Sequence, residues 1–133
     1  MKNGFVILLI VIVTTILAGC SSKEESTTPV TQKITAQEAK EMIDNNSDII
    51  ILDVRTKEEY NSGHIEDAIL IPDYEIVENA EIILTDKSTK ILVYCRSGNR
   101  SASATSALAE LGYTSVYDFG GIIDWPFEVV TEQ

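Results

Sequence analysis

The sequence is poor in the residues that build metal sites, disulfide frameworks and nucleic-acid-binding surfaces. Two cysteines and one histidine among 133 residues are too few for a metal finger or a disulfide-rich scaffold. Basic residues are also scarce, with ten against 21 acidic ones and a formal net charge of −11. This balance argues against binding to nucleic acid and against a basic surface that would grip an anionic membrane. The length and the abundance of aliphatic residues favour one globular domain.

The first nineteen residues contain no acidic side chain and have the parts of a secretory signal. Lys2 is followed by an apolar run over residues 5–13 and then by small residues up to Cys20. The apolar stretch of about 15 residues is shorter than the ~20 that a permanent membrane-spanning helix needs. An uncleaved N-terminal anchor is the alternative interpretation.

The end of this segment, Leu17-Ala18-Gly19-Cys20, resembles the lipobox of bacterial lipoproteins. The resemblance implies cleavage before Cys20, a diacylglyceryl group on its sulfur, and acylation of the new amino end by a fatty acid such as palmitate. Two or more acyl chains hold a protein firmly on a membrane, whereas one chain binds only marginally. We therefore expect a signal peptide over 1–19 and a lipid-anchored protein on the extracytoplasmic face of the cell membrane.

Residues 21–32 are mostly hydroxyl-bearing or charged, which is typical of a flexible, solvated segment. The sequence thus predicts three parts: the signal peptide, a lipidated cysteine with a polar tether over 20–32, and a globular domain over 33–133.

Within the domain, short apolar strands alternate with amphipathic helices. Such alternation predicts an α/β fold with a mostly parallel sheet and helices on both faces, whose ligands bind beyond the carboxyl ends of the strands. One helix is expected to place Ile76, Val77, Ala80 and Ile83 on a single buried face. Helices are expected over 35–45, 56–63, 73–84 and 101–111, and strands over 49–54, 68–71, 90–94 and 115–119.

The loop after the strand at 90–94 predicts a reactive cysteine. Cys95 stands between a buried strand and the start of a helix, where unpaired N–H groups and the helix dipole favour a thiolate. Arg96 and Arg100 add positive charge nearby. Gly98 and Asn99 tolerate the positive φ that a tight loop around a sulfur requires. The alternative is an inert, buried structural thiol.

Three stretches together resemble the rhodanese-like domain family. The run from Asp53 to Pro72 resembles its first half, Tyr94 to Ser101 its active-site loop, and Gly112-Tyr113 with Gly120 to Trp125 its closing segment. The similarity covers residues from about 33 to 130. It implies a three-layer α/β fold with a sheet of about five strands.

The resemblance implies sulfur transfer by Cys95. Its thiolate would take sulfane sulfur from a donor such as thiosulfate or a persulfide, become a persulfide, and pass the sulfur to a thiol or cyanide. No metal and no cofactor is implied beyond this transient cysteine persulfide. The amides of the loop would cradle the terminal sulfur, and Arg96 and Arg100 would attract an anionic donor. The expected loop residues are Arg96, Ser97, Gly98, Asn99 and Arg100.

The partners expected are a small sulfur donor, a thiol acceptor and, through the lipid, the membrane. A thiol-redox protein outside the cytoplasm is a candidate partner, because an activated thiolate there is prone to oxidation. We expect a monomer that binds no nucleic acid.

Other functions remain open at this point. Related phosphatases and arsenate reductases place the loop arginine six positions after the cysteine, in a cradle that fits a tetrahedral oxyanion. Here Arg100 stands five positions after Cys95, and Ser101 occupies the sixth. The smaller cradle favours sulfur over phosphate. A non-catalytic rhodanese-like binding module is the third hypothesis.

Four residues that match the family are expected to give structural support: Asp53, Arg55, Glu59 and His64. Arg55 is expected to pair with Glu59 or to tie its loop to the helix, and His64 to make a structural hydrogen bond. Asp67 departs from the family, which commonly has glycine there, and is expected to alter a surface turn.

Overall fold

The computed structural model describes residues 29–132. The predicted signal peptide, the predicted lipidation site Cys20 and most of the predicted tether lie outside these residues. Within them, no helix combines the length and the apolar content that crossing a membrane requires.

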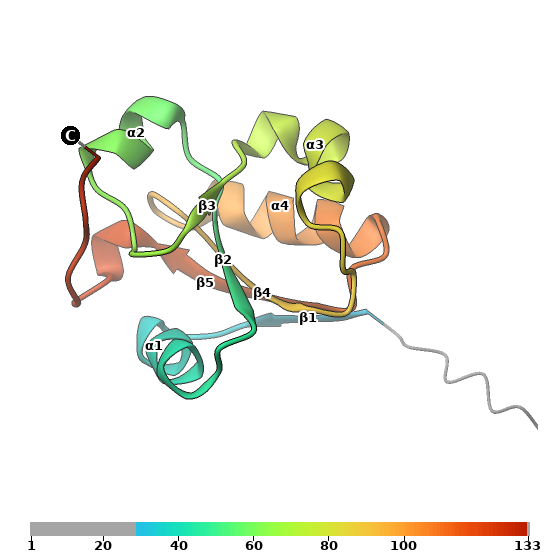
Figure 1. Ribbon diagram of the computed structural model, residues 1–133, viewed down its shortest axis with the longest axis horizontal. Helices are drawn as coiled ribbons and strands as arrows, with labels where there is room; N and C mark the ends of the chain where they lie inside the picture. The colour runs from blue at the N-terminus through green and yellow to red at the C-terminus, as the bar shows by residue number, and fades with distance from the viewer. Residues whose placement is uncertain (1–28, 133) are drawn as a thin grey trace, which may run out of the picture.

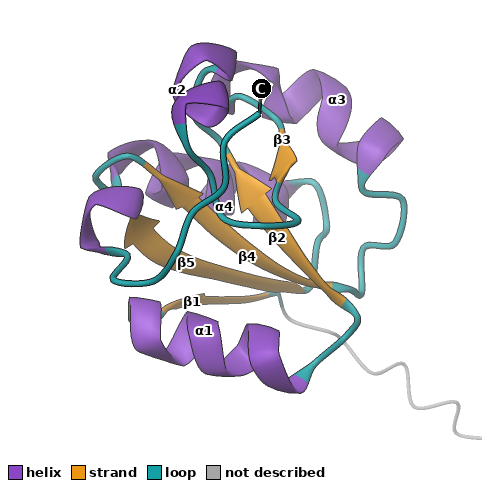
Figure 2. Cartoon of the chain, turned by 60° about the vertical axis from the view of Figure 1, so that its left-hand side comes forward, coloured by secondary structure: helices purple, strands orange, loops and turns teal. Residues whose placement is uncertain are grey.

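The centre of the fold is a five-stranded parallel sheet (Figure 2). The strands are adjacent in the order β1-β5-β4-β2-β3, and every neighbouring pair is parallel. This arrangement confirms the predicted α/β fold with its mostly parallel sheet. The strands are β1 (Val30–Lys33), β2 (Ile49–Asp53), β3 (Ile69–Leu70), β4 (Lys90–Cys95) and β5 (Ser115–Gly121).

Strand β1 corrects the predicted end of the tether. Val30 to Gln32, assigned to the tether, belong to β1 and pair with β5 from Ser115 onward. All four β1 residues are exposed, so the sequence of this strand lacks the alternation of apolar and polar residues that a strand with one buried face shows. The strand is an edge strand held by backbone pairing with β5, which no side-chain pattern announces.

The helices lie close to their predicted positions. Thr35 and Thr56 are the N-caps of α1 and α2, and each forms a capping box, with Glu38 and Glu59 respectively. The helices are α1 (Ala36–Asn45), α2 (Lys57–Ser62), α3 (Ile76–Ile83) and α4 (Asn99–Glu110), with short 3₁₀ turns η1 (Asp73–Glu75) and η2 (Ile122–Asp124).

The helix expected over 73–84 is divided, and its buried face is narrower than predicted. Its first turn is the 3₁₀ turn η1, and only then does α3 begin. Ile76, Ala80 and Leu84 are buried, whereas Val77 and Ile83 are 68% and 46% exposed. The prediction for Val77 and Ile83 was therefore wrong. The buried positions 76, 80 and 84 are spaced four residues apart, so they form a narrow stripe along one side of the helix. Only this stripe packs against the core.

The helices form two layers around the sheet. Helices α3 and α4 lie on one face, and α1 lies on the other, as Figure 1 shows. Strand β4 alternates between these layers: Ile91, Val93 and Cys95 join the core under α3 and α4, while Leu92 and Tyr94 join the core beside α1. The alternation therefore points Cys95 toward the α4 side, at the carboxyl end of a central strand.

Candidate active site

The site is built where β4 ends and the chain turns into α4. Cys95 is the last residue of β4 and is only 1% exposed. The backbone N–H of Gly98 turns back and donates a hydrogen bond to the Cys95 Sγ at 3.0 Å. Gly98 has a φ of +107°, which a side chain would disfavour, so the predicted need for glycine here is confirmed. Asn99 does not share this role, because it is already the first residue of α4.

Hydrogen bonds to the sulfur favour its ionised form. Burial by itself raises the pKa of the Cys95 thiol, but hydrogen bonds from the backbone and side chain of Ser101 and from the backbones of Gly98 and Ser97 oppose it. The net result is a pKa below the ordinary value for cysteine. The loop therefore favours a thiolate chiefly through backbone N–H groups around the sulfur, as an anion-binding nest does.

Ser101 links this loop to β5 through a buried carboxylate. Its Oγ lies 2.7 Å from Oδ1 of Asp118 and 3.0 Å from the carbonyl oxygen of Gly98, both of which can accept its single proton. The same Oδ1 accepts a hydrogen bond from the Gly120 N–H at 2.9 Å. Asp118 was not among the predicted site residues. The sequence feature that could have indicated it is a single acidic residue within the strand predicted over 115–119.

The packing of β5 against the loop requires glycine at position 121. A Cβ atom on Gly121 would lie 2.1 Å from the carbonyl oxygen of Arg96 and 2.6 Å from the Cα of Ser97. That oxygen also accepts a hydrogen bond from the Ile123 N–H at 3.3 Å. The closing segment thus forms one wall of the loop by direct backbone contact.

Arg100 is held by a carboxylate of α2. Its two terminal nitrogens donate to the two carboxylate oxygens of Glu59, each at 2.8 Å, and the backbone N–H of Thr56 donates to the same carboxylate at 3.0 Å. These bonds, those of Arg100 first, lower the pKa of Glu59 to about 2 despite the opposing effect of burial. The pair ties the loop to the N-terminal turn of α2.

The two predicted donor-attracting arginines therefore differ. The charge of Arg100 is already compensated by Glu59. Arg96 is exposed and makes no ion pair within residues 29–132. Arg96 is thus the cation of the loop that remains free to meet an anion.

The predicted support residues are present, with one pairing corrected. Arg55 does not pair with Glu59. Its Nε and terminal nitrogen donate to the two oxygens of Asp53 at 3.0 and 2.7 Å, and its guanidinium also donates to the Gly63 carbonyl at 2.7 Å. Asp53 is fully buried and Arg55 is 4% exposed. Arg55 thus pairs with Asp53, and Arg100 pairs with Glu59. The spacing of these residues along the chain did not indicate the pairings, because they depend on which carboxylate the fold brings close to each arginine.

His64 lies in the turn that follows α2. Its Nδ1 is 2.9 Å from the carbonyl oxygen of Tyr60, and its ring stacks on the Tyr60 ring with centroids 3.7 Å apart. Its backbone pairs with Val130 of the C-terminal segment. The hydrogen bond expected for His64 is therefore present. In the next turn, Asp67 has a φ of +63°, a conformation that glycine adopts freely and aspartate tolerates.

The described part of the chain, residues 29–132, has no group of three histidine, cysteine, aspartate or glutamate side chains placed to hold a metal ion. What the geometry presents is a strand, a tight loop and a helix around one cysteine sulfur whose pKa the loop lowers. This combination defines the class of α/β domains that use a cysteine as nucleophile.

Comparison with known proteins identifies the family. The model of the rhodanese-like domain matches residues 35–126. The chain therefore belongs to the rhodanese-like domain family.

Several known proteins are similar to this chain. The chain is 40% identical to thiosulfate sulfurtransferase PspE of Escherichia coli (strain K12), over 55% of this chain and 70% of that protein. It is 33% identical to a sulfurtransferase of Allochromatium vinosum, over 72% of this chain and 89% of that protein. The structure of a rhodanese-like domain protein from Staphylococcus aureus is similar with a TM-score of 0.68 and 31% identity, covering 77% of this chain and 99% of that one. These similarities support sulfurtransferase activity for this chain.

Proposed function

We propose that this protein is a sulfurtransferase whose Cys95 thiolate carries sulfur as a persulfide. The observation that carries the proposal is the Gly98 N–H donating to the Cys95 Sγ at 3.0 Å, within a loop that lowers the pKa of the thiol. A lowered pKa increases the fraction of the thiol present as thiolate, which is the form that attacks sulfur, and no neighbouring base is then needed.

The reaction proceeds in two displacements. The Cys95 thiolate attacks the outer sulfur of thiosulfate, a bond forms between the two sulfurs, and the bond to sulfite breaks with its electron pair leaving on sulfite. An acceptor thiolate or cyanide then attacks the outer sulfur of the persulfide, which returns the Cys95 thiolate. The amide-rich loop stabilises negative charge on either sulfur. Thiosulfate is a reasonable donor because PspE is named a thiosulfate sulfurtransferase and because Arg96 offers an uncompensated positive charge.

Intact mass is the direct test of the covalent step. Incubation with thiosulfate should add the mass of one sulfur atom to the protein, and cyanide or dithiothreitol should remove it. Cys95→Ser should gain nothing. A protein that keeps its original mass while its free thiol is intact would contradict the proposal.

Phosphatase or arsenate reductase activity is the competing enzyme function, and the loop argues against it. The thiolate interacts with amides that follow within a short turn, and Arg100 is held by Glu59 rather than left free for a tetrahedral oxyanion. Parallel assays with p-nitrophenyl phosphate and with thiosulfate plus cyanide separate the two functions. Phosphate release without thiocyanate would favour the phosphatase.

We further propose that lipid on Cys20 anchors the mature protein to the extracytoplasmic face of the cell membrane. The support is the order of a positive start, an apolar run and a lipobox-like sequence ahead of Cys20. In cell fractionation the protein should sediment with membranes, and Cys20→Ser should abolish the incorporation of labelled palmitate. Unchanged labelling of Cys20→Ser would contradict the lipid anchor.

A membrane-associated thiol protein is the partner we propose for reduction or sulfuration of Cys95. The described cysteine is a free thiol, so it has no internal disulfide to protect it from oxidants outside the cytoplasm. Mild oxidation should trap a mixed disulfide between Cys95 and such a partner in a membrane fraction. Absence of any adduct, with Cys95 still reactive, would count against this partner. Cys95→Ser that retained full cellular function would favour a non-catalytic binding role.

A further inference from the structure

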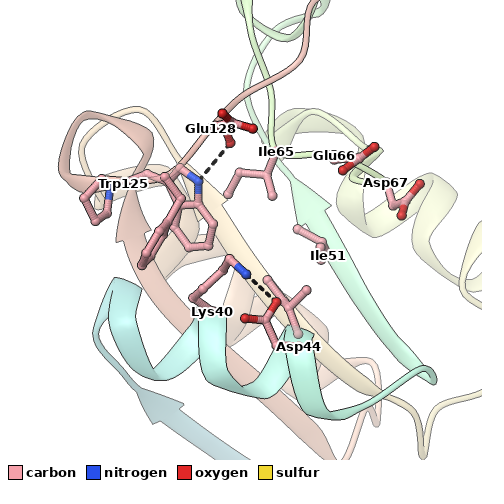
Figure 3. A pocket seen from close by; sticks show the side chains of 11 residues that line it. Lys40, Asp44, Ile51, Ile65, Glu66, Asp67, Trp125 and Glu128 are labelled. Carbon is pink, nitrogen blue, oxygen red and sulfur yellow. Dashed lines mark hydrogen bonds and ion pairs between the residues drawn. The ribbon is translucent and has the colours of Figure 1, made fainter.

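A cavity lies away from the sulfur, on the α1 side of the sheet (Figure 3). Its volume is about 560 Å³, within the range of pockets that hold small organic molecules. Helix α1, the turn before β3 and the C-terminal segment surround it. Nothing in the proposed sulfur chemistry uses this cavity.

The inner wall of the cavity is apolar and partly aromatic. Ile51 and Ile65 are 6% and 4% exposed, and Trp125 is 8% exposed. The rings of Trp125 and Phe127 meet edge to face, with centroids 4.9 Å apart. These surfaces would bury the hydrocarbon body of a ligand, and an aromatic face also attracts a cation.

The rim of the cavity is acidic. Asp44, Glu66, Asp67 and Glu128 line it; in Figure 3 Glu66 and Asp67 lie beside each other, Glu128 lies next to Trp125, and Asp44 lies next to Lys40. Lys40 is the only basic residue in the lining, and it already forms an ion pair with Asp44.

The other three carboxylates of the rim have no such compensation. Within residues 29–132, the side chains of Glu66, Asp67 and Glu128 form no ion pair. They do not form a cluster able to ligate a metal ion in that part of the chain. Negative charge spread around an apolar wall matches a ligand with one cationic end and a hydrocarbon body.

We propose that this cavity binds a small organic amine, with its hydrocarbon body against Ile65 and Trp125 and its ammonium group among Glu66, Asp67 and Glu128. The volume is several times that of one lysine side chain, which favours a free small molecule over a single side chain of a docked protein. The ligand class differs from the anionic sulfur donor proposed for Cys95, so the two sites do not compete for one molecule.

Three probes of similar length test the charge preference: 4-phenylbutylamine, 4-phenylbutan-1-ol and 4-phenylbutyrate. Trp125 is the only tryptophan, so quenching or shift of its fluorescence in the purified protein reports occupancy. The amine should bind about tenfold more tightly than the alcohol, because the three exposed carboxylates contribute about 2- to 5-fold each. The carboxylate should bind most weakly. Equal affinities for amine and alcohol, or no saturable change with any probe, would overturn the proposal.

Two conservative variants locate the ammonium group. Glu128→Gln and Asp67→Asn should each weaken the amine about 2- to 5-fold and leave the alcohol unchanged. Asparagine accepts the positive φ of position 67, so this variant should fold normally, as circular dichroism would verify. Glu110→Gln, an exposed carboxylate at the end of α4, is the matched control and should bind the amine as the native protein does.

A capped tripeptide with a central lysine distinguishes a protein partner from a small molecule. Weaker binding than 4-phenylbutylamine supports the free amine. Tighter binding of the peptide would transfer the site to a lysine of a partner protein and overturn the assignment.

Discussion

Two arginine–carboxylate pairs flank the reactive loop, and their surroundings differ sharply. Arg55 and Asp53 stand two residues apart, and their side chains are 5% and 0% exposed. Arg100 and Glu59 stand 41 residues apart, and their side chains are 30% and 28% exposed. Both pairs are held by two or more hydrogen bonds.

The difference shows how one chemical pairing can serve two purposes. The buried pair closes the end of β2 and also fastens Gly63 through the Arg55 guanidinium. Because both charges are out of water, each depends on the other. The half-buried pair joins the cysteine loop to α2 and compensates the charge of Arg100. Water reaches this pair and screens its charges, so its loss should change the activity of the site more than the stability of the fold.

The largest effect is expected from breaking the buried pair. Arg55→Leu leaves the fully buried Asp53 carboxylate without its partner and should lower the free energy of unfolding by about 3–5 kcal/mol. Urea denaturation followed by circular dichroism measures this. Replacing both partners, in the double variant Asp53→Leu with Arg55→Leu, should restore part of the lost free energy of unfolding, since no isolated buried charge remains. A single variant as stable as the native protein would show that the buried pair is not needed.

Removal of the half-buried pair should cost less stability and more activity. Glu59→Gln should lower the free energy of unfolding by about 1–2 kcal/mol, because charge-assisted bonds to Arg100 are weakened at a partly hydrated site. It should also slow thiocyanate formation several-fold, since the loop loses its tie to α2. The exposed neighbour Glu58 is the control, and Glu58→Gln should change neither quantity measurably. Equal effects of the two variants would contradict the role of the pair.

Acid should remove the contribution of Glu59 selectively. Its pKa falls from 4.5 to about 2 in the folded protein, so the carboxylate stabilises the fold fully above about pH 4.5. This contribution is lost as the pH falls from there through 2. The stability difference between native protein and Glu59→Gln should therefore shrink between pH 5 and pH 2, as urea denaturation at each pH would show. A constant difference would mean that Glu59 keeps its ordinary pKa.

The smallest effect on stability is expected at an exposed ion pair that belongs to neither of the two arginine–carboxylate pairs. Lys87 and Glu81 form an ion pair with side chains 42% and 52% exposed. Glu81→Gln should change the free energy of unfolding by less than about 0.5 kcal/mol, because water screens the pair and Lys87 keeps its bond to the Leu111 carbonyl. If urea denaturation showed a loss of more than about 1 kcal/mol in the free energy of unfolding, this exposed pair would stabilise the fold as much as the half-buried pair of Arg100 and Glu59.

Local sequence patterns predicted most of the elements but not their pairings. The capping boxes at Thr35 and Thr56 mark helix starts because a hydroxyl and a carboxylate three residues apart satisfy free N–H groups wherever they occur. Strand β1 escaped prediction because its exposed side chains carry no periodicity. The outward position of Val77 depends on which residues α3 presents to the core, and hydrophobicity alone does not show it.

The candidate site divides in the same way. Cys95 and Gly98 were predictable, since a strand end, a glycine and a helix start are local features. The contacts of Ser101 with Asp118 and of Arg100 with Glu59 join residues 17 and 41 positions apart. Only the packing of β5 and α2 against the loop brings these partners within hydrogen-bonding distance.

By itself, the sequence determined the alternating strands and helices, the capped helix starts and the cysteine at the end of β4, because these depend on neighbouring residues and on side-chain period. The tertiary structure decided which carboxylate each arginine meets, how Gly121 lets β5 approach the loop, and where the acidic, aromatic cavity forms. Such features depend on distances between segments remote along the chain, and those distances exist only once the sheet and its two helical layers have assembled.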